Sequence, residues 1–241
     1  MKMNLIIPPN RNVKNLGEFI DYWQNQYYTY TNVSDSIYNF CITSLKNNTD
    51  THKSICLIGA WKTNSISLYS NPGDIAFSCP CGKKYYFTGM WKSGTSSAHD
   101  IWVGLSKDYN RHKSLLSTPH SLISELESKT YNGARSPNTI FGLTYSLTYL
   151  HFLDPNGFPI FDKFVFLAVN FINSMETPDI PYKNNKSCRS FDDYIDNYVN
   201  KFNIIQKSLG KDNRCVDKAL WSFGHYISNS RQIIKPVCCK I

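Results

Sequence analysis

Apolar residues recur at helical spacing through most of the second half of the chain. Between residues 137 and 153, Ile140, Leu143, Leu147 and Leu150 share one face of a helix. We predict further helices over residues 96–116, 119–129, 163–175, 190–209 and 215–228.

The first hundred residues have a mixed pattern. Residues 16–31 and 36–48 are typical of helices, the first of them aromatic and amphipathic. Short runs rich in β-branched and aromatic residues, bounded by Asn, Gly and Pro, then predict strands; they are SICLIGAWKTN (54–64), ISLYSN (66–71) and IAFSCPCGKKYYFTG (75–89). We expect a mostly α fold with a smaller α+β N-terminal part. Its two regions are residues 1–97, of unassigned role, and the helical residues 98–241.

Local start and stop signals support the predicted helices. The DPNG sequence at residues 154–157 ends one helix, and Asp162 then caps the next. Ser190, with Asp193 three residues later, resembles a capping box. Two other helices follow a hydroxyl residue and a proline, namely Thr118-Pro119 and Ser136-Pro137.

The charge of the chain favours an anionic partner. The formal net charge is +8 and the isoelectric point is near 9.0, which places nucleic acid first among candidates. A sequence rich in Asn and Lys can also be basic for reasons of base composition alone. The N-terminal apolar run is too short for a signal peptide, and no stretch approaches a membrane-spanning length. We therefore expect a cytoplasmic, nucleoid-associated protein with no membrane contact.

Eight cysteines leave a metal site open as an alternative. The pair in CPC at 79–81 and the pair at 238–239 could together bind zinc, but neither has the two-residue gap typical of structural zinc sites. Disulfides are not expected without a secretion signal. We therefore predict free thiols, no metal and no cofactor.

A glycine-bearing turn precedes the helix expected at residue 137. A hairpin such as YNGAR at 131–135 exposes backbone N–H groups, which suit a phosphate together with the positive end of the helix dipole. Lys129 and Arg135 flank this turn and add positive charge. The residues predicted to contact DNA are Lys129, Asn132, Gly133, Arg135, Ser136 and Asn138.

The stretch FPIFDKFV, residues 158–165, sets an acid inside an apolar segment. Asp162 stands directly before a predicted helix and beside apolar neighbours. It can act as a helix cap, as a catalytic carboxylate ionised near a reacting sugar, or as both, since local N–H groups would stabilise its charge.

The order of elements and their motifs resemble the helix-hairpin-helix DNA glycosylase superfamily. In that family a hairpin grips the phosphate backbone, and a Pro-apolar-Asp loop precedes the next helix. More closely, YLHFLDPNGFPIFDKFV followed by VDKALWSFGHY is similar to the bacterial proteins of 8-oxoguanine glycosylase fold, some of which act in phage defence. The resemblance covers roughly residues 100 to 230 and leaves the first hundred residues unmatched.

The resemblance implies a DNA glycosylase that flips a damaged or modified base out of double-stranded DNA and excises it. Asp162 would then stabilise the cationic sugar or orient water. The chain departs from bifunctional members, because no Lys occurs between Lys129 and Lys163. The simplest inference is a monofunctional enzyme that leaves an abasic site. In the alternative, Lys163 or Lys129 acts as the nucleophile.

The predicted base pocket combines Phe158, His151, Trp221 and His225. Trp221 could stack on a flipped base or anchor the helix bundle, and His151 fits a hydrogen-bonded core histidine as well as an acid or base. Asp217 is expected to cap the last helix.

The sequence also allows a second class of function. A catalytically inactive module of the same fold would bind DNA or sense lesions without chemistry. For the enzyme, the base that is excised and the setting, repair or antiviral defence, do not follow from the fold. In both cases we expect a monomer whose partner is double-stranded DNA.

Overall fold

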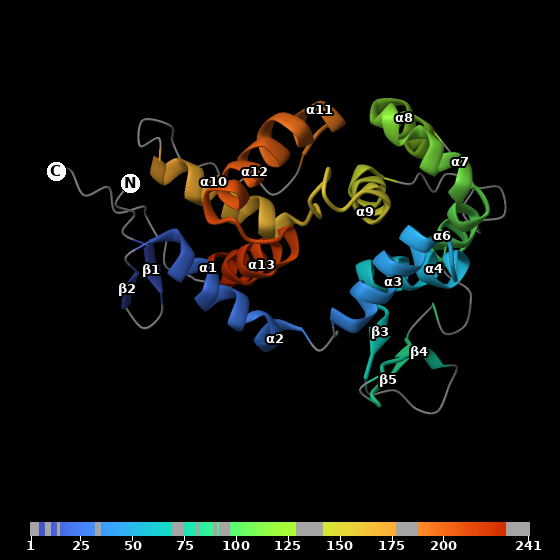
Figure 1. The fold of residues 1–241 in the computed structure, drawn as a ribbon, viewed down its shortest axis with the longest axis horizontal. Helices are drawn as coiled ribbons and strands as arrows, with labels where there is room; N and C mark the ends of the chain where they lie inside the picture. The colour runs from blue at the N-terminus through green and yellow to red at the C-terminus, as the bar shows by residue number, and fades with distance from the viewer. Residues whose placement is uncertain are drawn as a thin grey trace. The chain divides into compact units, whose positions relative to one another are not determined.

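The computed structural model describes residues 5–7, 11–13, 15–31, 35–68, 75–80, 82–88, 91, 97–128, 142–176 and 188–229. The elements it describes are mainly helices (Figure 1). The strands are β1 (Leu5–Ile7), β2 (Arg11–Val13), β3 (Ile66–Ser67), β4 (Ile75–Ser78) and β5 (Lys84–Phe87). The helices of the first half are α1 (Leu16–Asn25), α2 (Tyr27–Tyr30), α3 (Asp35–Asn47), α4 (Thr51–Lys62), α6 (Ser97–Lys107), α7 (Tyr109–Ser114), the short 3₁₀ turn η1 (Leu115–Ser117) and α8 (Pro119–Ser128). Those of the second half are α9 (Leu143–Leu153), α10 (Lys163–Glu176), α11 (Phe191–Tyr194), the π-helix η2 (Ile195–Val199), α12 (Asn200–Leu209) and α13 (Asn213–Asn229).

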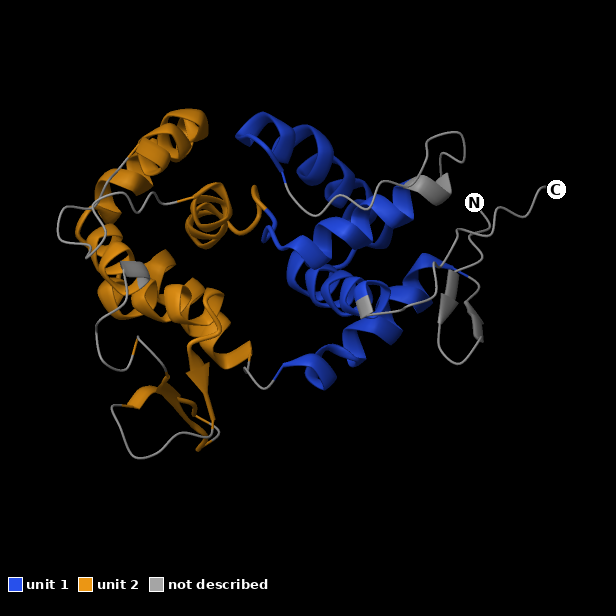
Figure 2. Cartoon of the chain, turned by 180° about the vertical axis from the view of Figure 1, so that it is seen from behind, with its two compact units in different colours: residues 1–31, 159–241 blue, residues 32–158 orange. Residues whose placement is uncertain are grey.

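The chain divides into two compact units (Figure 2). Unit 1 joins residues 1–31 to residues 159–241, and unit 2 comprises residues 32–158. The boundary expected between residues 97 and 98 falls inside unit 2. There α4 and α6 pack closely across it, because Gly59 has no side chain where the ring of Trp102 lies.

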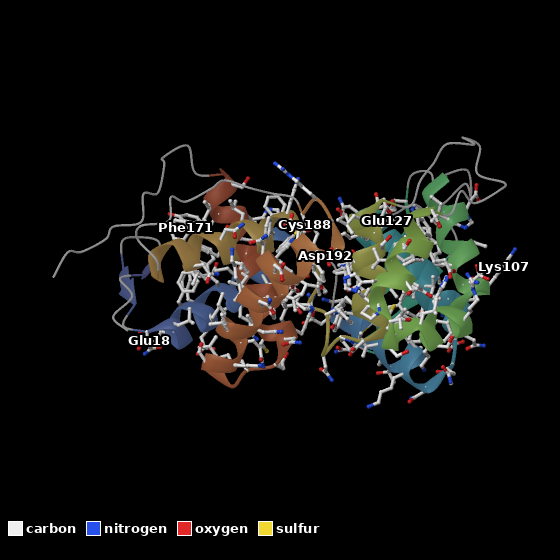
Figure 3. All side chains as sticks on the ribbon, turned by 90° about the horizontal axis from the view of Figure 1, so that it is seen from above. Glu18, Lys107, Glu127, Phe171, Cys188 and Asp192 are labelled. Atoms are coloured by element: carbon white, nitrogen blue, oxygen red, sulfur yellow. The ribbon has the colours of Figure 1, made fainter. Side chains whose placement is uncertain are left out.

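Unit 1 is built on α13, which packs against both α1 and α10. Phe223 lies at the centre of this arrangement. Its ring centroid is 4.8 Å from that of Phe19 on α1 and 5.3 Å from that of Phe171 on α10. Figure 3 shows Phe171 among the packed side chains of the unit, whereas Glu18 lies at its outer edge. The three helices therefore share one aromatic core.

Unit 2 packs α3, α4, α6, α8 and α9 around one another and adds a small antiparallel sheet of order β3-β5-β4. In the sheet, Ile66 pairs with Phe87 and Ser78 pairs with Lys84. The described part of the chain is thus mostly helical with little strand, which confirms the mostly α fold class. The hairpin expected at residues 131–135 lies outside the described residues.

Most predicted helices are confirmed, but the strand predicted at residues 54–64 is wrong. That segment belongs to α4, and residues 54–60 are all buried. A short run that is apolar on every side does not distinguish a buried helix from a buried strand, so its β-branched residues misled the prediction. Strands β3, β4 and β5 do lie within the other two predicted strand segments.

The cysteines differ in part from the expectation of free thiols. Cys41, Cys56, Cys188 and Cys215 are free, whereas Cys79 is disulfide-bonded. The prediction was drawn from redox compartment alone, and compartment does not exclude a local pairing.

Candidate active site

Asp162 caps α10, as predicted. Its side-chain oxygen Oδ1 accepts a hydrogen bond from the backbone N–H of Phe164 at 2.8 Å, and its backbone oxygen accepts one from Phe166 at 2.9 Å. The residue is half-buried. The carboxylate therefore lies at the positive end of a long helix, where the helix dipole favours its charge.

The loop that leads to Asp162 is held by two tyrosines. The hydroxyl of Tyr194 donates to the carbonyl oxygen of Pro159 at 2.7 Å, and that of Tyr198 donates to the carbonyl oxygen of Ile160. Both tyrosines are fully buried, and the ring of Phe161 makes edge contacts with both. The backbone just before Asp162 is thereby fixed on one side, as the first turn of α10 fixes it on the other.

Tyr198 lies in the π-helix η2 (Ile195–Val199), which follows Tyr194 directly. Tyr194 and Tyr198 are four residues apart, so they lie on one face of the helix. π-helical turns are rare and recur at functional sites. The two phenols donate to successive carbonyl groups.

Gly224 allows α13 to approach the start of α10. A Cβ atom built on Gly224 would lie 2.0 Å from the carbonyl oxygen of Phe164, which no real side chain tolerates. The adjacent His225 consequently stacks on Phe164, with ring centroids 3.6 Å apart and an interplanar angle of 28°.

The His225 ring lies among aromatic rings from three helices. In addition to Phe164 of α10, it stacks with Tyr30 of α2 at a centroid distance of 5.2 Å. Trp221, one turn earlier on α13, makes an edge contact at 4.1 Å. Trp221 also packs on Tyr27 at 5.2 Å, so it is anchored as well as partly exposed. We call Tyr30, Phe164, Trp221 and His225 the aromatic cluster.

The aromatic cluster keeps His225 neutral. Burial lowers the pKa of His225 below its usual value, and the ammonium of Lys163 lowers it further, while the carboxylate of Asp162 acts in the opposite direction. The ring nitrogen Nε2 is buried and has no hydrogen-bond partner among the described residues. The site thus combines a carboxylate on a helix end with an imidazole able to take a further hydrogen bond.

Lys163 is exposed at the first position of α10. Its ammonium lies over the ring of Phe164, 4.8 Å from the centroid. It therefore contributes positive charge at the edge of the aromatic cluster.

Asp217 does not cap the last helix, contrary to prediction. α13 begins at Asn213, and Asp212 accepts a hydrogen bond from the backbone N–H of Cys215 at 2.9 Å. Asp217 is buried one turn later and pairs with Arg214, whose guanidinium also donates to the hydroxyl of Tyr27 at 3.0 Å. The helix starts earlier than the sequence suggested because Asp212 already supplies the cap.

His151 and Phe158 of the predicted base pocket belong to unit 2. His151 is buried, and its Nδ1–H donates to the carbonyl oxygen of Phe158 at 2.7 Å. Its Nε2 lies 2.9 Å from the hydroxyl of Tyr38 and accepts from it, because the proton is on Nδ1. Both ring nitrogens are thus used in the core, and this histidine orders the loop after α9.

The predicted DNA contacts Lys129, Asn132, Gly133, Arg135, Ser136 and Asn138 lie outside the described residues. In the part of the chain that is described, no cluster of three or more His, Cys, Asp or Glu side chains could hold a metal ion. Within the same part, no helix is long and apolar enough to cross a membrane.

Sequence reasoning missed several residues of this site. Tyr194 and Tyr198 lie in a segment that was predicted only as a helix, and Phe164 was noted only as part of an apolar segment. The one available signal was the spacing of four between the tyrosines, which marks a shared face.

Comparison of the chain with protein-family models, with curated proteins and with solved structures returns no match in any of the three. The resemblance to the helix-hairpin-helix glycosylases therefore rests on the sequence segments that carry it. Those segments include Asp162 and Trp221, which the structure brings into unit 1.

Proposed function

We propose that the chain is a DNA glycosylase that flips out and excises a damaged or modified base and leaves an abasic site. One observation carries the proposal. Asp162 is a carboxylate fixed at a helix start by a loop that two buried tyrosines hold, and it stands within electrostatic reach of a neutral histidine in an aromatic cluster.

Asp162 would act on the sugar. As the bond from C1′ to the base nitrogen breaks, positive charge develops on the deoxyribose, and a fixed carboxylate stabilises that charge. Water then adds to C1′, one of its protons is lost, and the departing base takes up a proton. Carboxylates that are held in place before the reaction need little reorganisation, which is why the rigidity of the loop matters.

The aromatic cluster would receive the base. Stacking on aromatic rings stabilises an unpaired base by about 1–3 kcal/mol, whatever its identity. The half-buried His225, whose lowered pKa favours the neutral ring, would offer a hydrogen bond to the edge of the base. Trp221 and Tyr30 are both partly exposed and can contact the same base.

The absence of a Lys at the hairpin helix favours hydrolysis without a covalent intermediate. Lys163 is the nearest alternative nucleophile, but its ammonium lies over the Phe164 ring at the surface. The net charge of +8 suits a double-stranded DNA partner. The setting is base-excision repair or antiviral defence in the cytoplasm, with the protein acting as a monomer.

The test uses Asp162→Asn, because Asn caps helices as well as Asp does. The variant keeps the cap and removes the charge. Duplexes carrying single modified bases are incubated with enzyme and treated with alkali, which breaks the strand at abasic sites. Breaks made by the wild type and lost in Asp162→Asn support the glycosylase. The matched control is Asp154→Asn, since Asp154 also accepts a backbone hydrogen bond, from Gly157 at 3.0 Å, and should keep full activity.

Two further outcomes decide between alternatives. A covalent adduct trapped by borohydride would show a lysine nucleophile, and its loss in Lys163→Ala would identify which one. Binding of duplexes without strand breaks on any substrate, viral DNA included, would favour the inactive binding module instead. Mass spectrometry of bases released from genomic and phage DNA identifies the substrate.

A further inference from the structure

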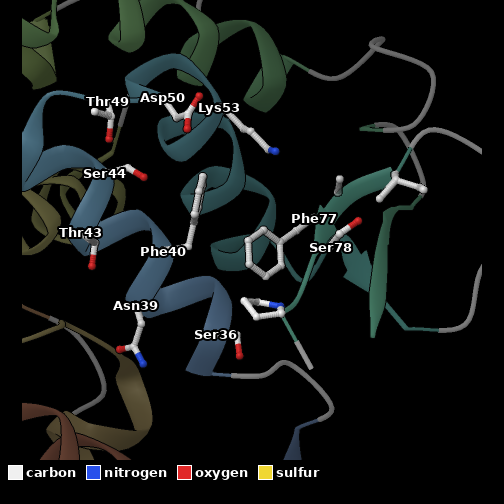
Figure 4. Close-up of a pocket in the computed structure, with 13 residues that line it drawn as sticks. Ser36, Asn39, Phe40, Thr43, Ser44, Thr49, Asp50, Lys53, Phe77 and Ser78 are labelled. Carbon is white, nitrogen blue, oxygen red and sulfur yellow. The ribbon is translucent and has the colours of Figure 1, made fainter. Parts of the chain in front are cut away.

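Unit 2 contains a pocket of about 800 Å³, between the side of α3, the start of α4 and strand β4 (Figure 4). Phe40 of α3 and Phe77 of β4 lie beside each other in its wall, with ring centroids 5.2 Å apart. The pocket is lined entirely by residues of unit 2, so it shares no residue with the aromatic cluster. Its volume is in the range of small-molecule sites.

Polar groups converge on the same pocket. Ser44 lines it and is only 4% exposed. Asn39 and Thr43, from the same helix, add an amide and a second hydroxyl. A serine hydroxyl can both donate and accept hydrogen bonds, so Ser44 offers a bond to a polar ligand in the pocket.

The start of α4 supplies charges of both signs. Asp50 precedes the helix in a left-handed conformation, with φ of 46°, and its side chain makes no capping hydrogen bond. The first N–H groups of α4 are therefore not bonded by that carboxylate. Lys53 lies one turn on, with its ammonium 5.5 Å from the centroid of Phe40. Figure 4 shows Asp50 and Lys53 on the same side of the pocket.

We propose that this pocket binds a nucleoside monophosphate. Lys53 and the N-terminal end of α4, a twelve-residue helix, would take the phosphate. Asp50 would accept hydrogen bonds from the sugar hydroxyls, and Phe40 and Phe77 would contact the face of the base. Ser44, Thr43 and Asn39 offer donors and acceptors for the edge of the base. This inference does not rest on the glycosylase proposal.

The mixed lining argues against simpler ligands. A wholly apolar molecule would cover the charges of Asp50 and Lys53 without pairing either of them, which disfavours its binding. A bare anion would use Lys53 but not the two rings. A nucleotide uses all of these groups at once, and its size suits the volume.

The test is isothermal titration calorimetry of the full chain with purine and pyrimidine nucleoside 5′-monophosphates, with adenosine and inorganic phosphate as fragments. We expect a nucleotide to bind more tightly than either fragment. Lys53→Met should weaken the nucleotide by about tenfold or more, because it removes a charged hydrogen bond, while leaving adenosine unchanged. Phe40→Leu should weaken nucleotide and adenosine alike.

The matched control is Lys46→Met. Lys46 is an exposed cation on α3 that does not line the pocket, and its loss should leave binding unchanged. The proposal is overturned by any of three results: no nucleotide binding at millimolar concentration, equal weakening in Lys53→Met and Lys46→Met, or phosphate or a free aromatic amino acid binding as tightly as the nucleotide. Lys53 is exposed, so its variant should fold even where Phe40→Leu does not.

Discussion

Gly224→Ala tests the contact that brings α13 to the start of α10. The added methyl group would lie 2.0 Å from the carbonyl oxygen of Phe164 and 2.5 Å from its carbonyl carbon. Both atoms belong to the backbone of the first turn of α10, so no side-chain rotation relieves the clash. Because ordinary contact begins near 3.4 Å, one helix must move by about 1.4 Å (3.4 minus 2.0) relative to the other.

The expected cost follows from two opposing effects. Overpacking a well-packed core costs about 1–3 kcal/mol, and clashes with backbone lie at the upper end. Ala is a better helix former than Gly by about 1 kcal/mol. We therefore expect the free energy of unfolding to fall by about 2 kcal/mol, with the ring of His225 displaced from that of Phe164.

Urea unfolding measures the loss of unfolding free energy, and a base-excision assay measures the consequence of displacing His225. Gly142→Ala is the control, because a Cβ there meets no described atom within 4 Å and the backbone φ is −67°. That variant should change the free energy of unfolding by less than about 0.5 kcal/mol. If Gly224→Ala proved as stable as the wild type, the close approach of the two helices would be refuted. If it lost stability but kept full excision, the link between this contact and the site would fail.

Four further outcomes are expected. Because burial lowers the pKa of His225, the unfolded chain binds more protons than the folded chain below about pH 6.5, so stability is fully present above that pH and falls below it. The fall of the urea midpoint with pH that is due to this residue should disappear in His225→Gln. An unchanged pH dependence of the midpoint in that variant would contradict the prediction. Burial, and to a lesser degree the nearby carboxylate of Asp193, raises the pKa of Cys188 from 9.0 to about 12. At pH 8 the rate at which Cys188 reacts with iodoacetamide should therefore be about a thousandfold below that of an ordinary thiol, and a normal rate would contradict this. Arg214→Ala removes the guanidinium from the buried Asp217 and should lower stability by about 3 kcal/mol, against little change for Arg111→Ala at the surface. Duplex binding should weaken steeply between 50 and 200 mM salt, and insensitivity to salt in a filter or anisotropy titration would count against DNA as partner.

The sequence was sufficient wherever one local signal determined one element. Asp162 caps α10 because an acid stands directly before a long apolar run. Ser190 likewise accepts a hydrogen bond from the backbone N–H of Asp193 at 3.1 Å, as its spacing predicted. The apolar pattern also predicted the interior of α13, although it did not predict the residue at which this helix begins.

Prediction failed where tertiary contact decided the result. The segment 54–60 is buried on every side, so no polar face reveals a helical period, and its contact with Trp102 through Gly59 joins residues far apart in the sequence. The hydrogen bonds from Tyr194 and Tyr198 join residues more than thirty positions apart. No local pattern encodes such contacts, so the support of the site had to come from the structure.

Capping and chemistry make different demands on Asp162. The cap needs an oxygen that accepts from the N–H of Phe164, which Asn supplies as well as Asp. Charge stabilisation of a cationic sugar needs the full negative charge, which Asn lacks. A helix cap does not require further support from the loop before it. The hydrogen bonds that hold the carbonyl groups of Pro159 and Ile160 would therefore be unnecessary if Asp162 were only a cap. The loop held by Tyr194 and Tyr198 and the glycine at the helix contact are instead what a carboxylate with a fixed direction would need. The exchange of Asp162 for Asn separates the two roles, because it keeps the cap and removes the charge.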